Sequence, residues 1–426
     1  MIRIVVSLLG LEFVKKYWAA IAAVGLFWII AGGALCIDAL DGVIFFPLKF
    51  FGCLLVIDGA VTLVLTAAGQ SYSGKLRNMK GIIYVIIGLL IIDPHHFSDV
   101  ILALLFGSAF ATEGILQTVT AHVVRFPGWR LSLWVGIAEI LFAIIVFEPY
   151  PTHYAGTVPF CIGAGLMISG LNLFRMALRL RRTSAYVSVP VFLNPGSKVL
   201  NFVPKHAGQT RMRKLVVHVW TAAGTIREAV HRPVVDRYIA AVDKRGVIST
   251  GHSALEVEPD LYISHYPAMD IDRSPEQFRQ TLLATCENDV PGKFQPSYAF
   301  EAQQWCESTI QVNFYDFDEE RLRLFWENYK QDTTYNLTRR NCSVAVAHAL
   351  ETALEGALRR DGENLLSILK VFLCPELWAA GQLHKRARTM AWTPGLVLDY
   401  ARSMQAVLRR PRVYAQQVNS QFAENS

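Results

Sequence analysis

The chain has 426 residues, a formal net charge of +6 at pH 7, and a hydrophobic fraction of 52%. This length exceeds one typical domain of about 150 residues, so we expect two or three domains. Long apolar stretches with few charges extend to about residue 180, and an ordinary mixed sequence follows. The seven cysteines have neither close pairs nor a CxxC spacing, which argues against a disulfide framework and a zinc site.

Six apolar windows occupy the first part of the chain. A helix that crosses the bilayer core needs about 20 predominantly apolar residues. The windows 17–40, 44–68, 80–93, 99–121, 129–148 and 154–178 meet or approach this length. The first fifteen residues lack a small-residue cleavage site and lead straight into a span, so no secretory signal is evident. We therefore expect an all-α bundle of six transmembrane helices over residues 1–182.

The charges between the windows predict an orientation. Basic residues gather before the first window, between the second and third, between the fourth and fifth, and after the sixth: Lys15, Lys16, Lys75, Arg77, Lys80, Arg125, Arg130, Arg175, Arg179, Arg181 and Arg182. The alternate loops carry acids instead: Asp38, Asp41, Asp93, Asp99 and Glu148. By the positive-inside rule, both termini are expected on the cytoplasmic side.

A glycine pattern recurs in the even-numbered windows at about 55 residues. Gly52 precedes Asp58-Gly59, Gly107 precedes Glu113-Gly114, and Gly163 precedes Ser169-Gly170, each time with the same spacing. The odd windows show a related pattern. We interpret it as three helical hairpins related by internal repetition, with glycines where helices approach closely.

Ionisable residues lie inside the predicted spans at Asp58, Glu113 and Glu139, and Ser169 holds the matching position of the last repeat. A charged group in the membrane costs at least a few kcal/mol and normally faces the bundle interior. One interpretation is a proton-sensing or ion-handling site. We favour a structural role in hydrogen bonding between helices, because a position that recurs across a fold is more often architectural.

With this topology and repeat, residues 1 to about 180 resemble the HdeD acid-resistance membrane family. The resemblance implies a protein of the bacterial inner membrane that is associated with stress or acid resistance, and it implies no established chemistry. The long extension beyond residue 180 departs from the short members of that family.

The second part of the chain predicts an α+β domain. Residues 183–212 contain several prolines and glycines, as expected of a linker. Apolar runs predict strands at 215–220, 234–242, 251–257 and 261–266, and helical patterns follow at 275–288, 318–330 and 343–360. Strands followed by helices indicate an antiparallel sheet over residues 213–360.

Two histidines lie on neighbouring predicted strands. His252 and His265 flank Glu258-Pro259-Asp260, which has turn chemistry. A hairpin centred between Glu258 and Pro259 would place the histidines directly opposite each other, with Cβ atoms about 4.5–5.5 Å apart. A register slip of one residue would place them on opposite faces.

Cys342 directly precedes a predicted helix, for which Asn341 or Thr338 could supply the cap. The helix dipole and the adjacent Arg339 and Arg340 favour a thiolate, and the free N–H groups at the helix start, together with Asn341, could serve an oxyanion. A cysteine nucleophile needs a base and a group that orients the base. Each residue alone has an ordinary structural explanation, but their combination is much less common.

This order of residues resembles the permuted papain-like cysteine hydrolases, specifically the group of the lecithin:retinol acyltransferase family and its bacterial peptidase or amidase relatives. The resemblance covers about residues 213–360. It implies that Cys342 is the nucleophile, that His252 is the base and that His265 is the orienting residue. The chain lacks the fuller acyltransferase signature from Ser343 onward, so peptidase, amidase and acyl transfer all stay open.

Residues 361–426 predict an amphipathic, basic helical region, either lying at the membrane surface or forming an ordinary buried helix with a basic face. We expect no cofactor and no metal, because His218, His231 and His348 lack ligand spacing and no phosphate-binding glycine loop is present. Nucleic acid is not an expected partner.

The expected function is that of a membrane-tethered cytoplasmic cysteine hydrolase, linked to stress or acid resistance. Its partners would be membrane lipids and a protein, peptide or lipid substrate at the cytoplasmic face, and a homo-oligomer is left open. One alternative is a stress-response membrane protein without enzymatic activity, whose soluble domain binds a partner. The other is a proton-coupled channel or transporter that uses Asp58, Glu113 and Glu139.

Overall fold

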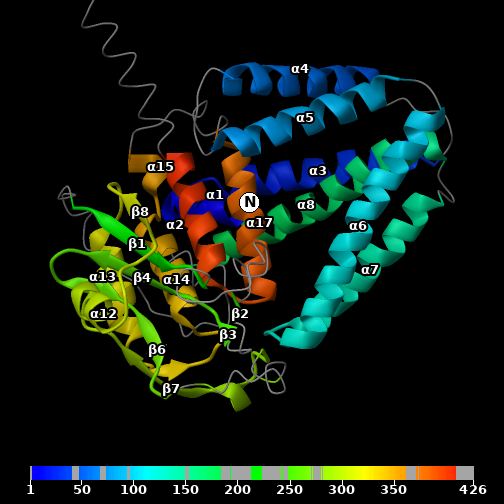
Figure 1. The fold of residues 1–426 in the computed structure, drawn as a ribbon. Helices are drawn as coiled ribbons and strands as arrows, with labels where there is room; N and C mark the ends of the chain where they lie inside the picture. The colour runs from blue at the N-terminus through cyan, green and yellow to red at the C-terminus, as the bar shows by residue number, and fades with distance from the viewer. Residues whose placement is uncertain are drawn as a thin grey trace, which may run out of the picture. The chain divides into compact units, whose positions relative to one another are not determined.

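The computed structural model describes residues 2–40, 48–67, 73–93, 96–148, 153–183, 192, 213–222, 241–242, 248–269, 271, 280, 282–360, 371–372 and 374–408 (Figure 1). The chain divides into two compact units. The membrane unit comprises Val14–His122 and Arg130–Thr183. The sheet unit comprises Met1–Phe13, Val123–Trp129 and Ser184–Ser426.

Long helices make up the membrane unit: α3 (Trp18–Asp38), α4 (Leu48–Ala67), α5 (Ser73–Ile92), α6 (His96–Val124), α7 (Trp129–Phe147) and α8 (Thr157–Arg182). Within the described residues, α3, α6, α7 and α8 are long and apolar enough to cross a membrane. The chain is therefore a membrane protein. The described parts of α4 and α5 do not add to this set, and a total of six spans stays a prediction.

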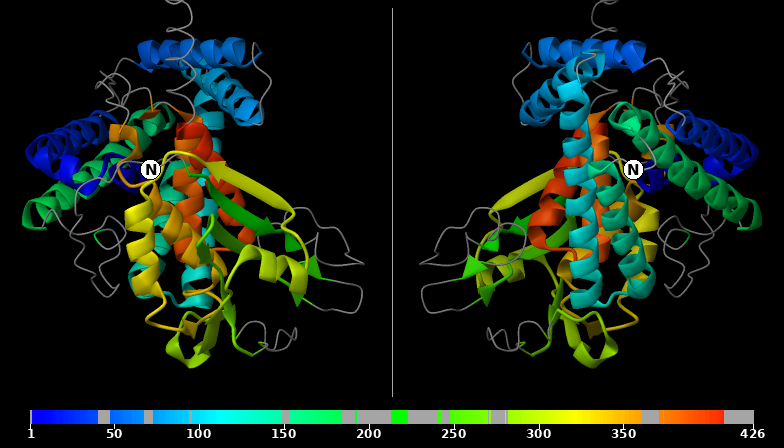
Figure 2. Two further views of the ribbon diagram at one scale, coloured as in Figure 1. Left: turned by 90° about the vertical axis from the view of Figure 1, so that its left-hand side faces the viewer. Right: turned by 90° about the vertical axis from the view of Figure 1, so that its right-hand side faces the viewer.

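The long helices pack as three antiparallel pairs, α3 with α8, α4 with α5, and α6 with α7; Figure 2 shows the first two pairs side by side in both views. Glycines face each other across each pair: Gly25 with Gly170, Gly32 with Gly163, Gly52 with Gly88, Gly59 with Gly81, and Gly114 with Gly136. A Cβ atom added at any of them would lie 2.5–3.0 Å from the carbonyl oxygen of the facing glycine. Only glycine permits so close an approach of two backbones.

The pairing differs in one respect from three consecutive hairpins. Two pairs join neighbours in sequence, but the third joins the first long helix to the last. In the repeat, α4 packs on α5 and α6 packs on α7, so each of these helices packs on the next one along the chain. No long helix follows α8 within the membrane unit, and α8 packs on α3, the first long helix, instead.

Asp58 has a partner inside the membrane unit. Its Oδ2 lies 2.8 Å from Nζ of Lys80, so an ion pair connects α4 with α5. This contact fits the structural interpretation of the acid at that position. The other predicted intramembrane polar residues, Glu113, Glu139 and Ser169, lie on α6, α7 and α8.

Antiparallel strands form the frame of the sheet unit. The main sheet has the order β5 (Leu261–Ile263), β4 (His252–Val257), β1 (Leu215–Trp220) and β8 (Ile310–Phe314). A second sheet contains β6 (His265–Pro267), β7 (Val290–Phe294) and β9 (Thr334–Tyr335), and β2 (Ala241–Val242) pairs with β3 (Ile248–Ser249). The structure confirms the prediction of a helical N-terminal part followed by an α+β region with antiparallel sheets.

The sheet unit also contains the helices α12 (Tyr298–Gln304), α13 (Glu319–Tyr329), α14 (Cys342–Ala353), α15 (Ala357–Arg360) and α17 (Pro375–Thr389), helical residues 394–408, and the 3-10 turn η3 (Cys286–Asn288). Almost all of the predicted linker 183–212 and most of the predicted strand 234–242 lie outside the described residues. Of the predicted helix 275–288, the structure describes residues 280 and 282–288, in which residue 280 is helical and η3 forms a 3-10 turn.

The two faces of the main sheet differ in chemistry. One face carries buried aliphatic residues such as Leu215, Val217 and Leu255, and these pack with α14 in the main core. The opposite face carries polar and aromatic side chains of β1, β4 and β5, and α12 contacts it through Tyr298 and Glu301. The alternation of side chains along a strand separates the two sets. The candidate site lies where the polar face meets the start of α14.

The N-terminal helix α1 (Ile2–Leu9) belongs to the core of the sheet unit, and α2 (Leu11–Lys16) follows it. Leu8 is fully buried, and Ile4 and Val5 lie in the same core cluster as α14. The N–H of Gly356 donates to the carbonyl of Ser7 at 2.9 Å. The sequence pattern gave no sign that this segment packs on residues more than 300 positions further along the chain.

Candidate active site

Cys342 is the first residue of α14, and the helix start is held by its neighbour. Asn341 is the N-cap, and its side-chain oxygen accepts a hydrogen bond from the N–H of Val344 at 2.8 Å. The Asn341 amide nitrogen donates to the carbonyl oxygens of Leu337 and Trp392. The Asn341 side chain is thus fully used in capping and anchoring, which leaves an oxyanion to the backbone N–H groups at the helix start.

The structure brings His252 to Cys342. Burial is the largest influence on the pKa of Cys342 and raises it, but the charge and hydrogen bond of His252 act in the opposite direction. The backbone N–H of Ser253 and the hydroxyl of Ser343, 3.7 Å from the sulfur, add to this effect. Together they lower the pKa of Cys342 to about 7. A substantial thiolate fraction is therefore present near neutral pH.

His252 responds in the complementary direction. Burial is the largest influence on its pKa and lowers it, whereas Cys342 and Glu301 raise it, and the sum lies above the usual value. The thiol and the imidazole therefore favour each other's charged forms and titrate as a coupled pair.

Glu301, on α12, binds the other side of the imidazole. Its Oε1 lies 3.2 Å from His252 Nε2, which also lies 3.0 Å from the Ser264 hydroxyl. Since Nε2 faces these two groups, Nδ1 is the nitrogen left for Cys342. Cysteine, imidazole and carboxylate thus form a chain of three groups, the arrangement of a nucleophile with its base and an orienting residue.

The Glu301 carboxylate is 2% exposed and accepts hydrogen bonds from several side chains. Tyr262 and Ser264 donate to Oε2 at 2.7 and 3.0 Å, and Tyr266 donates to Oε1 at 2.6 Å. Burial first, and then the charge of Glu301, raise the pKa of both tyrosines, so both phenols keep their protons and act as donors. These donors hold the carboxylate in a single orientation.

The prediction that His252 lies directly opposite His265 is wrong, because the register of the β4–β5 pair differs from the predicted one by one residue. Val257 pairs with Leu261 and Leu255 with Ile263, so the connection between β4 and β5 has three residues, Glu258 to Asp260, where the prediction assumed two. One extra loop residue turns His265 to the opposite face. Tyr266 takes the predicted place, and its ring stacks on His252 with centroids 4.1 Å apart.

His265 lies in a different environment. It belongs to β6, and its Nδ1 is 3.0 Å from the hydroxyl of Tyr329 on α13. Its ring is fully buried against Phe294 and Tyr335. Burial first, and then Arg340, lower the pKa of His265 to about 4, so the imidazole stays neutral at physiological pH. His265 was predicted to orient the His252 imidazole, but the group that contacts His252 Nε2 is Glu301.

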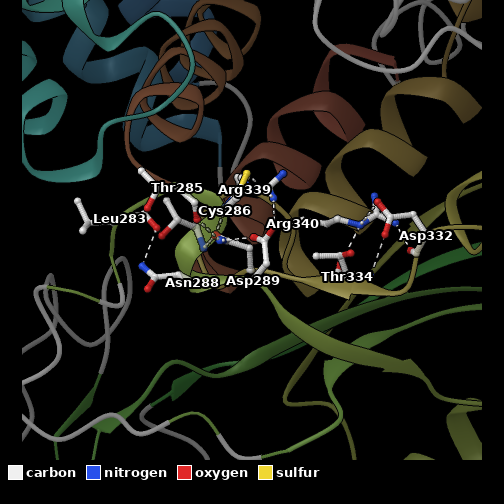
Figure 3. Close-up of polar contacts among 11 residues, drawn as sticks. Leu283, Thr285, Cys286, Asn288, Asp289, Asp332, Thr334, Arg339 and Arg340 are labelled. Atoms are coloured by element: carbon white, nitrogen blue, oxygen red, sulfur yellow. Dashed lines mark hydrogen bonds and ion pairs between the residues drawn. The ribbon is translucent and has the colours of Figure 1, made fainter.

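Arg339 and Arg340 fix the loop that leads to Cys342 (Figure 3). Arg339 forms an ion pair with Asp289, which also accepts from the Asn336 amide at 2.9 Å. Arg340 donates to the carbonyl oxygens of Thr334 and Tyr329 at 2.9 and 2.8 Å. The main influences on the pKa of Cys342 include neither arginine. Their positive charge was predicted to act on the thiol, but the structure uses it for loop geometry.

Access to the sulfur is narrow. Cys342 is 7% exposed and His252 is 3% exposed. Among the described residues, no group of His, Cys, Asp or Glu side chains is arranged to hold a metal ion.

Glu301 is the site residue that sequence reasoning missed. It stands in a short helix without a catalytic motif, more than thirty positions from either partner. The only signal was an acid among aromatic residues in 298–305. No family model, curated protein or solved structure matches the chain, so the interpretation of the site rests on its geometry.

Proposed function

We propose that the protein is a membrane-tethered cysteine hydrolase or acyltransferase that acts on an amide, ester or thioester. The observation that carries this proposal is the position of His252 between Cys342 and Glu301. The proposal retains the resemblance of this region to permuted papain-like hydrolases, with Glu301 in place of His265 as the orienting residue. The substrate is a protein, peptide or lipid near the membrane.

In the first half of the proposed reaction, the Cys342 thiolate attacks the carbonyl carbon of the substrate and forms a C–S bond. The negative charge moves to the carbonyl oxygen, which the N–H groups at the start of α14 stabilise. The intermediate collapses when the bond to the leaving group breaks. The imidazolium of His252 donates its proton to the leaving amine, alcohol or thiol, and a thioester remains on Cys342.

In the second half, water or an acceptor nucleophile attacks the thioester while His252 takes its proton. The bond to sulfur breaks, and the acyl group leaves as an acid or on the acceptor. Glu301 keeps the imidazole in one tautomer and stabilises its positive form throughout, because its lone pairs face Nε2. Hydrolysis and acyl transfer differ only in this acceptor.

The proposal places the sheet unit at the cytoplasmic face of a bacterial inner membrane, in a stress or acid response. The supports are the basic loops after windows two, four and six and the resemblance of the first part of the chain to the HdeD family. A tether raises the effective concentration of substrates close to the bilayer. A reporter fused after Arg182 that is active only outside the cytoplasm would contradict this orientation.

The direct test is capture of the thioester. Purified full-length protein in detergent is incubated with p-nitrophenyl esters of short linear acids, and the intact mass and the modified peptide are determined. We expect one acyl group on Cys342, lost in Cys342→Ala and strongly reduced in His252→Ala. Acylation of the exposed Cys286 at an equal rate would show ordinary thiol chemistry and reject the proposal.

A further inference from the structure

The helix that carries Glu301 is held at both ends by one imidazole. Tyr298, the first residue of α12, stacks on His218 of β1 with ring centroids 4.1 Å apart and planes inclined by 20°. Beyond the end of α12, the Ser308 hydroxyl lies 3.1 Å from His218 Nδ1. The Ser308 N–H also donates to the Tyr298 hydroxyl at 3.1 Å. His218 therefore contacts the chain on both sides of α12, a helix of seven residues, and links its start to the segment after its end.

His218 is itself locked in place. Its Nε2 lies 3.0 Å from Oε2 of Glu256 on the neighbouring strand β4, and the residue is 2% exposed. A carboxylate only accepts hydrogen bonds, so Nε2 carries a proton and donates it. In the neutral ring, Nδ1 then accepts the hydrogen bond of the Ser308 hydroxyl. Both nitrogens are used, and the ring has one orientation.

The position of α12 matters because Glu301 lies at its centre and binds His252. A helix of seven residues has little stability of its own and depends on tertiary contacts. Further anchors are the three hydrogen bonds that Glu301 accepts and the Trp220 indole, which donates to the Cys306 carbonyl at 2.8 Å. A small shift of α12 lengthens the 3.2 Å contact between Glu301 and His252, and the charge of Glu301 is, after Cys342, one of the influences that raise the pKa of His252.

We infer that His218 is a positioning residue that holds Glu301 against His252 through α12, an inference that rests on the proposed function. His218 touches neither the nucleophile nor the leaving group. Its influence is inferred to reach Cys342 through Glu301 and then through His252. The ring contacts of Trp220 with His218 and His252, with centroids 6.2 and 5.4 Å apart, form a second route that the coupling test separates from the first. The inference therefore makes a specific statement about energetic coupling: a change at His218 matters to the thiol only while Glu301 is present.

A double-mutant cycle tests this coupling in the full-length protein. The rate of iodoacetamide labelling at Cys342 is measured by peptide mapping from about pH 5.5 to pH 9.5 in wild type, His218→Phe, Glu301→Gln and the double variant. His218→Phe keeps an aromatic ring beside Tyr298 and removes both hydrogen bonds. We expect its labelling midpoint to rise by about one pH unit in the wild-type background and not to rise further in Glu301→Gln.

Three further variants keep the test decisive. Ser308→Ala removes one anchor without altering the buried ring, so it replaces His218→Phe if that variant does not fold. His218→Gln retains one donor and one acceptor, so its labelling midpoint should lie between those of wild type and His218→Phe. His384→Phe removes another buried histidine that pairs with a glutamate, 3.1 Å from Glu351, and should lower stability without moving the midpoint.

Equal shifts from His218→Phe with and without Glu301 would overturn the inference, as would an unchanged midpoint in a folded His218→Phe. Failure of the proposed function looks different. In that case wild-type Cys342 itself would titrate like an ordinary thiol near pH 9, and His252→Ala would leave the midpoint unchanged.

Discussion

His252 and Tyr266 stack on each other and bind the same carboxylate oxygen, Oε1 of Glu301. The stacking fixes the plane of the imidazole, and the shared oxygen fixes its rotation within that plane. Two constraints of different kinds thus aim Nδ1 at the start of α14. Such support of a reacting group by a second layer of contacts is typical of catalytic sites.

Glu301→Gln should raise the pH midpoint of Cys342 labelling by about one unit and so slow the labelling at pH 7 by about fivefold. The amide removes the negative charge that favours the imidazolium, and a less charged His252 stabilises the thiolate less. Iodoacetamide kinetics with peptide mapping measure both values. Glu319→Gln is the matched control, because Glu319 pairs with Arg213 on the surface and should leave the profile unchanged.

His252→Ala should move the labelling midpoint of Cys342 from about 7 to at least the ordinary thiol value of 9.0. Without His252, burial is the main remaining influence and raises the pKa of the thiol. A pH titration of the labelling rate measures the shift, and the exposed Cys286 in the same sample serves as an internal reference. A midpoint that stays near 7 would show that another group stabilises the thiolate.

Ionisation of Cys342 should also appear in the stability of the protein. The folded pKa of about 7 lies below the unfolded value of 9.0, so the folded state releases the proton more readily. Stability from this source is complete above pH 9 and is lost as the pH falls through 7. His252, whose folded pKa is raised by Cys342, contributes in the opposite direction, so the difference in thermal midpoint between wild type and Cys342→Ala should grow between pH 7 and pH 9 by less than the Cys342 shift alone would give.

His265 should behave as a structural residue, with a pH dependence of the same direction but in a lower pH range. Its folded pKa of about 4 lies below the unfolded value of 6.5, so between these values only the unfolded chain takes up the proton. Its contribution to stability is complete above pH 6.5 and falls as the pH is lowered to 4. His265→Phe should reduce this loss in acid unfolding experiments. If folded His265→Phe changed the pH profile of Cys342 labelling, His265 would have a role in the active site.

Gly32→Ala should destabilise the α3–α8 pair, because the added Cβ would lie 2.5 Å from the carbonyl oxygen of Gly163 and 2.8 Å from the backbone nitrogen of Met167. Gly33 is the matched control, since a Cβ there has no atom within 4 Å. Gly33→Ala should leave stability unchanged or raise it by up to about 1 kcal/mol through helix propensity. Thermal aggregation in detergent, followed by size-exclusion chromatography, compares the two.

Local patterns predicted the parts of the molecule that depend on local chemistry. The apolar windows located the long helices, and the cap sequence placed Cys342 at a helix start. His252 was found because a strand histidine and a helix-start cysteine carry recognisable signals. The face of His265 depended on a single loop residue, which the turn composition did not determine.

Other features depend on contacts between distant segments. Glu301 owes its role to four side chains that the fold assembles around it, and no spacing in the chain encodes that assembly. The pairing of α3 with α8 likewise joins helices far apart in the chain. The equal spacing of Gly25 and Gly32 on α3 and of Gly163 and Gly170 on α8 was the signal that could have predicted it. The charges of Arg339 and Arg340 were visible, but their carbonyl partners were not.

The burial of α1 in the core of the sheet unit sets an order for biosynthesis. The ribosome makes α1 before the long helices of the membrane unit, whereas α14, α15 and α17 are made after all of them. Until then Leu8 and its apolar neighbours lack the surface that covers them. A chain that ends before α14, α15 and α17 cannot complete this core. The Cys342 site should therefore form only after these helices have been made, when membrane insertion is already under way.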